Sequence, residues 1–374
     1  MCLYFQMIQS GIEPDQVSFL YALKVCSEIR GFFHVGRIIH YHIMRYGLDP
    51  NVLVGSTLID MYAKCGWLVE GHYVLSKLQN RNSISWGVLV SGYARHGCID
   101  FSLYLIECMN KEGMILDKAT FLCILKACGR EKTIAHGMLI HSRMVSIGFE
   151  FDHFLVNSLV DMYAKCKLME EALYVFENAS EKDVVCWVAL ISGYIQLKKD
   201  KYSIELFKEM QQKGVSPDRV SFLCVLKACG NLGMVIEGHI IHGCIVKYGF
   251  DINTDIQNTL IHVYSKCGFR EEAYLVFDQS RNRDVVSWSA MAAGYVEEGS
   301  SSHALELFHA FQKEAIDPNT FLFSSVLTAC GSLRALHQGR LIHGYIIING
   351  HESDVVVANS LIDMYGKCGS LNDS

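Results

Sequence analysis

The sequence predicts an all-α solenoid of two-helix repeats, and three observations lead to that prediction. A tetrapeptide recurs with a period of 101 residues, as Tyr62-Ala63-Lys64-Cys65, Tyr163-Ala164-Lys165-Cys166, Tyr264-Ser265-Lys266-Cys267 and Tyr365-Gly366-Lys367-Cys368. Single aromatic residues keep the same period, at Trp86, Trp187 and Trp288 and at His40, His141, His242 and His343. Apolar residues within each repeat follow helical spacing. Two-helix repeats cannot bury their apolar faces alone, so neighbours stack into a solenoid.

The composition limits the class of protein. With 374 residues, 51% hydrophobic and 19% charged, the chain can bury a large core and is not a disordered protein. Its net charge of −6 argues against coating nucleic acid by bulk charge, but leaves room for a local basic track. The 15 cysteines include no Cys-x-x-Cys pair, so we expect reduced cysteines packed as small hydrophobes. The sequence shows no membrane span, secretory signal or Arg-rich transit peptide.

Each period divides into three related pieces, such as 153–183, 184–218 and 219–253, which have 31, 35 and 35 residues. Each piece is expected to form two helices. In the first piece, one helical face carries Val156, Leu159, Val160 and Tyr163, and a second face carries Leu168, Ala172, Val175, Phe176 and Ala179. The break between them often contains glycine. All four prolines lie in junctions between pieces, whereas a proline inside a helix costs about 3 kcal/mol.

The period predicts ten complete repeats between residues 16 and 354. The first of them carries one extra residue within Arg30–His34. Residues 1–15 are expected to be the second helix of a partial P repeat, and 355–374 a partial S repeat, so we expect a single solenoid that is a segment of a longer or truncated protein. The complete repeats are 16–51, 52–82, 83–117, 118–152, 153–183, 184–218, 219–253, 254–284, 285–319 and 320–354.

Three signatures recur in a fixed order within these repeats: Trp288-Ser289-Ala290-Met291, Leu226-Lys227-Ala228-Cys229 and Leu361-Ile362-Asp363-Met364-Tyr365. They resemble the P, L and S signatures of the pentatricopeptide repeat family, in its plant organellar PLS subclass. The resemblance covers almost the whole chain. It implies a right-handed superhelix with repeats in L-S-P order, each reading one base of single-stranded RNA. Tetratricopeptide repeats, which are uniformly 34 residues long, match these alternating lengths less well.

The resemblance places base reading on the fifth residue of each first helix and on the last residue of the repeat. Asparagine is a poor helix former, yet it recurs at this fifth position, and its amide can both donate and accept. A structural bond to the neighbouring backbone is the alternative, and Asp or Asn at repeat ends are ordinary N-cap residues. The base-reading residues implied are Ser56 with Asn82 for adenine, Asn157 with Asp183 and Asn258 with Asp284 for uracil, Ser289 with Asn319 for adenine, and Asn359.

Other repeats depart from this pattern. The weaker or atypical pairs are Gly87 with Asp117, Val188 with Asp218 and Ser324 with Asp354. The remaining L repeats carry Leu20, Leu122 and Leu223 at the fifth position and are expected to read nothing directly. The implied RNA is A-n-n-U-n-n-U-A. Equal affinity for this octamer and for one with both uracils changed to guanine would reject the register.

The resemblance also implies contacts to the RNA backbone and between bases. The implied phosphate contacts are Lys64, Arg95, Lys165, Lys266 and Lys367. Gln196 and Glu297 interrupt this series, and a solvated lysine favoured by the helix dipole is the alternative. The second residues of the P repeats, Ile84, Val185 and Val286, are similar to the apolar wedges of the family, although they could equally belong to the core.

We find no catalytic chemistry in the sequence. The His-x-Glu and Cys-x-x-Cys of zinc deaminases are missing, as are phosphate-binding loops and nucleophile elbows. The periodic histidines lie one per period and are expected to be packed or hydrogen-bonded. We therefore expect no enzyme activity, cofactor, metal, membrane contact or small-molecule substrate.

The expected function is sequence-specific binding of single-stranded organellar RNA. The resemblance implies the site-recognition part of cytidine-to-uridine RNA editing or other RNA processing, in a mitochondrion or chloroplast, with a deaminase or editing-complex protein in trans as a further partner. The alternatives are a protein-binding helical-repeat scaffold and a truncated fragment without independent function.

Overall fold

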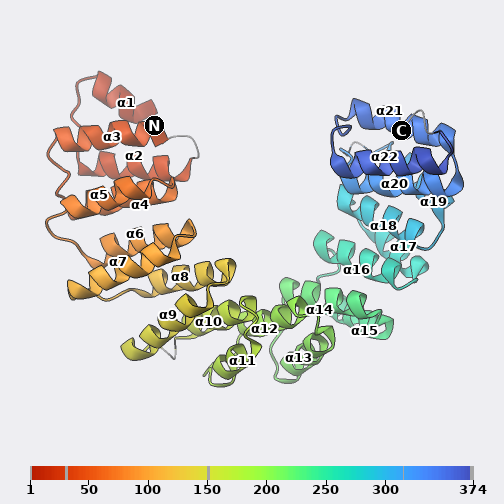
Figure 1. Cartoon of the computed structure of the whole chain (residues 1–374), viewed down its shortest axis with the longest axis horizontal. Coiled ribbons are helices and arrows are strands. Elements are labelled where there is room, and N and C mark those ends of the chain that lie inside the picture. The colour runs from red at the N-terminus through yellow and green to blue at the C-terminus, as the bar shows by residue number, and fades with distance from the viewer. Residues whose placement is uncertain (1, 30–32, 150–151, 315, 371–374) are drawn as a thin grey trace. The chain divides into compact units, whose positions relative to one another are not determined.

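The computed structural model describes residues 2–29, 33–149, 152–314 and 316–370, and their regular secondary structure is entirely α-helical. The extra residue expected within 30–34 therefore falls largely outside the described residues. The chain divides into two compact units, Met1–Gly193 and Tyr194–Ser374, with the boundary inside one helix. Figure 1 shows helices following one another as stacked pairs within each unit.

The first unit contains the helices α1 (Cys2–Gln9), α2 (Gln16–Glu28), α3 (Phe33–Arg45), α4 (Val52–Lys64), α5 (Leu68–Lys77), α6 (Ser83–Arg95), α7 (Ile99–Lys111), α8 (Lys118–Glu131), α9 (Ile134–Ile147), α10 (His153–Lys165), α11 (Met169–Glu177) and most of α12 (Val184–Gln196). The second unit contains α13 (Asp200–Gln212), α14 (Arg219–Leu232), α15 (Val235–Lys247), α16 (Thr254–Lys266), α17 (Arg270–Gln279), α18 (Val285–Glu297), α19 (Ser301–Phe311), α20 (Thr320–Leu333), α21 (Leu336–Ile348) and α22 (Val355–Lys367).

The first helices of successive pairs pack directly on one another. In the first unit they form the row α2, α4, α6, α8 and α10, and in the second unit the row α14, α16, α18, α20 and α22. Each second helix packs mainly on the first helices beside it. The predicted face of the first helix is confirmed, because Val156, Leu159, Val160 and Tyr163 are all buried. The second predicted face is confirmed in part, since Ala172, Val175 and Phe176 are buried whereas Leu168 and Ala179 are half-buried. Burial of such side chains stabilises the stack by about 25 cal/mol per Å² of apolar surface removed from water.

Acidic and amide side chains start the first helices. The residue before the helix accepts a hydrogen bond from a backbone N–H of the first turn, as Asp117 does in α8 and Asp218 does in α14. Such caps satisfy N–H groups that have no partner inside the helix. The second helices from α5 to α21 begin without a side-chain cap from the described residues, after a turn that often needs a positive φ. Gly268 takes this conformation easily, while Lys167 takes it with φ 65°.

The periodic histidines bond to tyrosines. His40, His141, His242 and His343 each place Nδ1 2.8 to 3.0 Å from the hydroxyl of the tyrosine 22 residues later, on the next first helix. The expectation of packed or hydrogen-bonded histidines is therefore confirmed. Burial lowers the pKa of His40, His141 and His242, and it raises the pKa of Tyr62 and Tyr264 to about 12. These bonds tie each L repeat to the S repeat that follows.

This burial predicts a loss of stability in mild acid. The unfolded histidines titrate near pH 6.5, and the folded ones at lower pH, so the unfolded chain binds more protons in that window. The free energy of unfolding should therefore fall as the pH drops from about 7 through about 6. We expect urea midpoints to fall between about pH 7.5 and about pH 5.5, and the fall to shrink in a variant combining H40Q, H141Q and H242Q. An unchanged pH response in that variant would contradict the assignment.

Candidate nucleic-acid interface

The structure brings the fifth and last residues of several repeats together. Asn157 Nδ2 donates to Asp183 Oδ2 at 2.8 Å, and Asn258 Nδ2 donates to Asp284 Oδ1 at 3.1 Å. In a P repeat, Ser289 Oγ lies 2.9 Å from Asn319 Oδ1. These pairs form because the last residue of one repeat caps the next first helix, and consecutive first helices lie side by side. The side chains of each pair thus meet across two neighbouring helices.

The first S repeat differs in its contacts. Ser56 Oγ donates to the Val52 carbonyl at 2.7 Å, within its own helix, while Asn82 Oδ1 accepts from the Ser85 backbone N–H. The described chain shows no direct bond between Ser56 and Asn82. Asn359 lies on the exposed surface of α22. Adenine reading by Ser56 therefore requires its hydroxyl to leave the backbone or to share its proton.

The two members of each pair differ in exposure. Asn157 and Asn258 are only 6% and 8% exposed, whereas the Asp183 carboxylate is half-buried and Asp284 is exposed. The amides are thus held by protein contacts, and the carboxylates are their more open partners. Burial opposes ionisation of Asp284, but hydrogen bonds from the Ser287 backbone N–H and the Asn258 amide lower the pKa of its carboxyl. This acceptor is therefore a carboxylate at neutral pH.

The atypical repeats present few free hydrogen-bonding side chains at the fifth and last positions. A Cβ added to Gly87 would lie 2.6 Å from Thr120 Oγ1, so the packing leaves no room for a polar side chain there. Val188 is half-buried. Ser324 Oγ bonds to Ser360 Oγ at 2.9 Å, and the carboxylate of Asp354 accepts from Thr320 Oγ1 at 3.2 Å. Asp117 and Asp218 cap their helices.

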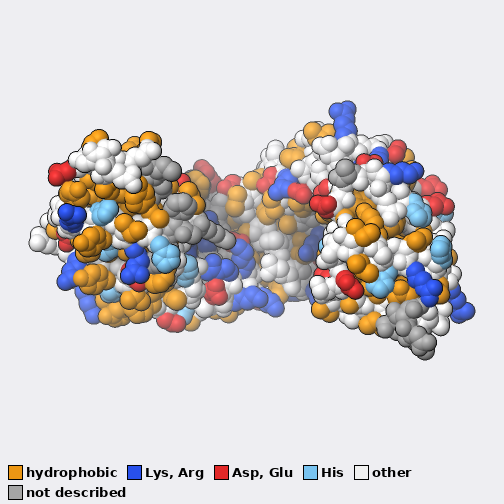
Figure 2. Space-filling model, turned by 90° about the horizontal axis from the view of Figure 1, so that it is seen from above, with side chains coloured by type: hydrophobic (Ala, Val, Ile, Leu, Met, Phe, Trp, Pro, Cys, Tyr) orange, Lys and Arg blue, Asp and Glu red, His pale blue; other side chains and the backbone are white. Residues whose placement is uncertain are grey.

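A ladder of exposed apolar side chains accompanies the pairs. Ile84, Val185 and Val286 are 58%, 55% and 49% exposed, so the alternative that they belong to the core is wrong. The same second position is also apolar and exposed in most S and L repeats, although it is Asp255 in the S repeat that contains Asn258. Sequence reasoning missed these residues, and the repeat register would have found them. Those residues are Val17, Leu53, Phe154, Val220, Phe321 and Val356. Figure 2 shows apolar side chains interspersed with charged ones on one face of each unit.

Most of the proposed phosphate-binding lysines already have a partner. Lys64 and Lys165 lie 2.7 and 2.6 Å from Asp60 and Asp161 one helical turn earlier, and Lys367 lies 2.6 Å from Asp363. Lys266 has His262 in place of that aspartate and forms no ion pair with the described residues. Arg95 Nε donates to the Ser91 carbonyl and is otherwise exposed. An RNA phosphate would have to compete with an aspartate at three of these sites, although exposed pairs of this kind contribute only about 0–1 kcal/mol.

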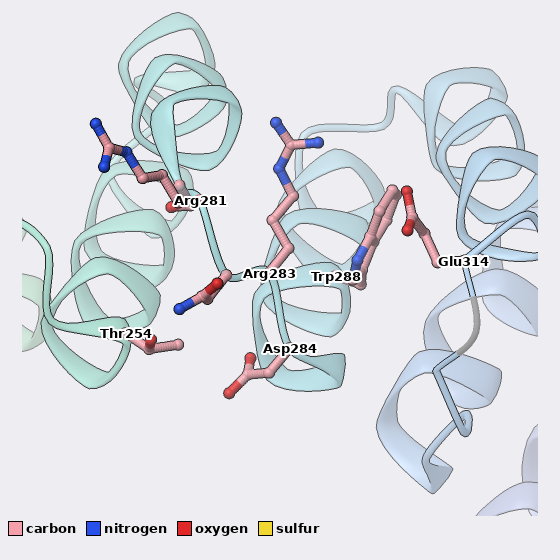
Figure 3. Close-up of a pocket in the computed structure, with 8 residues that line it drawn as sticks. Thr254, Arg281, Arg283, Asp284, Trp288 and Glu314 are labelled. Carbon is pink, nitrogen blue, oxygen red and sulfur yellow. The ribbon is translucent and has the colours of Figure 1, made fainter.

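Two arginines that sequence reasoning missed line the same pocket as Asp284. An open pocket of about 640 Å³ is lined by Thr254, Ser280, Arg281, Asn282, Arg283, Asp284, Trp288 and Glu314. Both arginines belong to the loop between α17 and α18, and Figure 3 shows their side chains extending away from the carboxylate of Asp284. Arg283 is anchored by hydrogen bonds to the carbonyls of Phe277 and Asp278, at 2.9 and 2.7 Å, and lies 3.4 Å from the carboxylate of Asp278. Guanidinium groups at such a place suit a phosphate.

The described residues show neither a metal centre nor a membrane span. They contain no group of three or more His, Cys, Asp or Glu side chains placed to hold a metal ion. Their helices are all too short or too polar to cross a bilayer.

The fold and the pairs together define an α-solenoid of short two-helix repeats that carries one polar pair in several of its repeats. Models of the PPR repeat match residues 56–83, 84–114, 154–184 and 258–285, the PPR repeat family matches 182–231, and the pentatricopeptide repeat domain matches 279–332. The chain belongs to the pentatricopeptide repeat family, as its signatures predicted.

Curated relatives in Arabidopsis thaliana carry the same family name. One is 33% identical over all of this chain and 45% of its own length. A chloroplastic relative is 32% identical over 98% of this chain and 45% of its own, and a mitochondrial one is 32% identical over 98% and 53%. The chain spans about half the length of these relatives.

The fold is also that of solved structures. The pentatricopeptide repeat protein PPR10, crystallised with an 18-nucleotide RNA element, matches with a TM-score of 0.76 at 16% identity, over 99% of this chain and 59% of PPR10. The structure of PPR10 from maize matches with a TM-score of 0.61 at 18% identity, over 98% and 58%. The predicted α-solenoid is thus confirmed.

Proposed function

We propose that this chain binds single-stranded RNA and reads its sequence through the fifth and last residues of its repeats. The observation that carries the proposal is the bonded Asn–Asp pair, which occurs at the same place in two successive periods. A uracil offers a carbonyl oxygen as acceptor and N3–H as donor. The amide N–H of Asn258 and the carboxylate of Asp284 are the complementary groups.

The surroundings of the pairs support the same function. Exposed apolar side chains such as Val185 and Val286 can lie against base faces, because every base has a π-face that accepts such contacts. Cations at Arg95 and Lys266 supply charge for the RNA backbone, as do Arg281 and Arg283 in the loop that precedes Asp284. PPR10, which has the same fold, was crystallised with RNA.

The repeat lengths and order support assignment to the PLS subclass, with the repeat boundaries given above. Each first helix begins at the first residue of such a repeat, as α10 does at His153 and α16 at Thr254. In the cell the chain would serve as the site-recognition part of cytidine-to-uridine editing or other RNA processing. Relatives named chloroplastic or mitochondrial support an organellar setting. Any deaminase would be supplied in trans or by another part of the full protein.

The salt dependence of binding tests this function. For single strands the affinity falls with a slope of about −0.7 per phosphate contact, so five contacts predict a loss on the order of 100-fold between about 50 and about 200 mM salt. Fluorescence anisotropy with labelled A-n-n-U-n-n-U-A would measure it. Unlabelled RNA should displace the label and an extended acidic peptide should not. Displacement by the peptide, or affinity that is independent of salt, would contradict the proposal and favour a protein-binding scaffold.

A further inference from the structure

The two Asn–Asp pairs have the same residues but different neighbours. Ser287, the third residue of α18, places Oγ 2.6 Å from Asn258 Oδ1, so the amide oxygen is hydrogen-bonded. The equivalent third residue of α12 is Cys186, which is fully buried. There the oxygen Asn157 Oδ1 is buried and has no hydrogen-bond partner in the described chain. An unsatisfied buried acceptor costs about 1–3 kcal/mol, so this difference is energetically significant.

The carboxylates of the two pairs also differ in their hydrogen bonds. Asp284 Oδ1 accepts from both Asn258 Nδ2 and the Ser287 backbone N–H, at 3.1 and 2.9 Å. It also lies 3.0 Å from Ser287 Oγ, but the single hydroxyl proton is assigned to the shorter contact with Asn258 Oδ1. Its second oxygen makes no hydrogen bond to the described residues, and Asp284 lines the open pocket of Figure 3. Asp183 instead uses both oxygens, Oδ1 for the Cys186 N–H and Oδ2 for Asn157 Nδ2, at 3.0 and 2.8 Å. Only the Asp284 pair keeps one carboxylate oxygen free for a base.

We propose that the third residue of the following helix, Ser287 in one repeat and Cys186 in the other, determines how strictly the Asn–Asp pair distinguishes uracil from cytosine. This inference rests on the proposed base reading. It adds a third side chain to the two that are proposed to read the base, namely the fifth and last residues of the repeat. That third side chain acts by fixing the orientation of the asparagine amide.

The chemistry of the two bases gives the direction. Uracil presents a carbonyl acceptor and the N3–H donor, whereas cytosine presents an amino donor and the N3 acceptor. Because Ser287 holds Oδ1, Asn258 turns its N–H toward the base. Cytosine would then place its amino group against this N–H and its N3 acceptor against the Asp284 carboxylate, so neither hydrogen bond could form. At Asn157 no hydroxyl holds the amide oxygen. Turning this amide to accept from the amino group of cytosine breaks no bond to a third side chain, so the mismatch costs less.

A purely structural role for Ser287 is the alternative, because it also completes a capping box with Asp284. That role would affect helix stability and would leave base preference unchanged. The reciprocal exchange S287C and C186S separates the two roles. Each variant keeps the backbone N–H that the aspartate accepts from, and each differs from the native side chain by one atom.

The experiment measures the affinity of the wild type, S287C, C186S and the double exchange for three octamers. One is A-n-n-U-n-n-U-A, and the others carry cytosine at the fourth or at the seventh base. In the wild type we expect the penalty for cytosine at the seventh base, read by Asn258, to exceed that at the fourth base by roughly five- to tenfold. S287C should reduce the seventh-base penalty, C186S should raise the fourth-base penalty, and the double exchange should invert their order.

Equal penalties in the wild type, or penalties that do not follow the exchange, would overturn this inference while leaving uracil reading intact. A lack of uracil preference at both bases would overturn the proposed function itself. Thermal unfolding of the same variants identifies any loss of fold. If S287C unfolds, C186S still decides the matter, because it predicts a gain in discrimination that damage to the fold does not produce.

Discussion

Replacing Asp284 by asparagine is expected to remove most of the proposed preference for uracil over cytosine at the seventh base. In the native chain Oδ1 of Asp284 accepts from Asn258 and from the Ser287 backbone, which leaves Oδ2 for the N3–H of uracil. Asparagine must keep its single oxygen toward those two donors. Its amide N–H then occupies the place of Oδ2 and meets the N3 acceptor of cytosine.

The expected effect is large because the substitution replaces a hydrogen-bond acceptor by a donor at the atom that faces the base. A pair of hydrogen bonds to one base discriminates by about 1–3 kcal/mol. The ratio of uracil affinity to cytosine affinity at the seventh base should therefore change by roughly 10- to 100-fold. The substitution should spare the fold, since Asn and Asp are equally good N-caps. Competition binding with the two octamers measures the ratio. A D284N variant that prefers uracil as strongly as the native chain would contradict the assignment.

The same substitution at Asp152 provides a matched control. Asp152 also ends a repeat and caps a first helix, but its carboxylate is paired with Lys118 and the fifth residue of its repeat is Leu122. The Lys118 side chain and helix N–H groups lower the pKa of Asp152 against the effect of its burial. We expect D152N to leave base preference at every position unchanged. A change there would mean that the last residue acts on RNA by some route other than direct reading.

The repeat register predicted more of the structure than any single motif. Because Tyr163 and Trp187 recur with one period, the boundaries of the helices around them could be expected, and their burial followed from helical spacing. The histidines were expected to be packed or hydrogen-bonded, but their partner tyrosines could not be named. That partnership depends on how one second helix lies against the next first helix, which spacing alone does not specify.

The candidate site was predicted in its residues but not in its contacts. The sequence shows Asn258 and Asp284 at fixed positions, yet the link from Ser287 depends on side-chain orientation across two helices. The pairing of Lys165 with Asp161 could have been predicted from the sequence, because residues four apart are neighbours on a helix surface. The exposure of Val286 was left open, since an apolar residue near a helix start can face either core or solvent.

The repeat-ending residues have two roles, which explains why their pattern alone was ambiguous. Asp284 caps α18 through one oxygen and faces the pocket with the rest of its carboxylate. A cap alone would accept Ser or Thr as readily as Asp or Asn. Capping does not require an asparagine on the neighbouring helix, so it does not explain why the two residues occur together. Base reading accounts for that combination, and a test of the register therefore tests the central claim.

The most direct measurement compares two octamers of identical composition. With cytosine at the unassigned bases, one carries uracil at the fourth and seventh bases, where Asn157 and Asn258 would meet it, and the other carries uracil at the third and sixth. The penalties for the two displaced uracils multiply, which predicts an affinity on the order of 100-fold lower for the second octamer. Equal affinities at the same salt concentration would show that the chain does not read bases in this register.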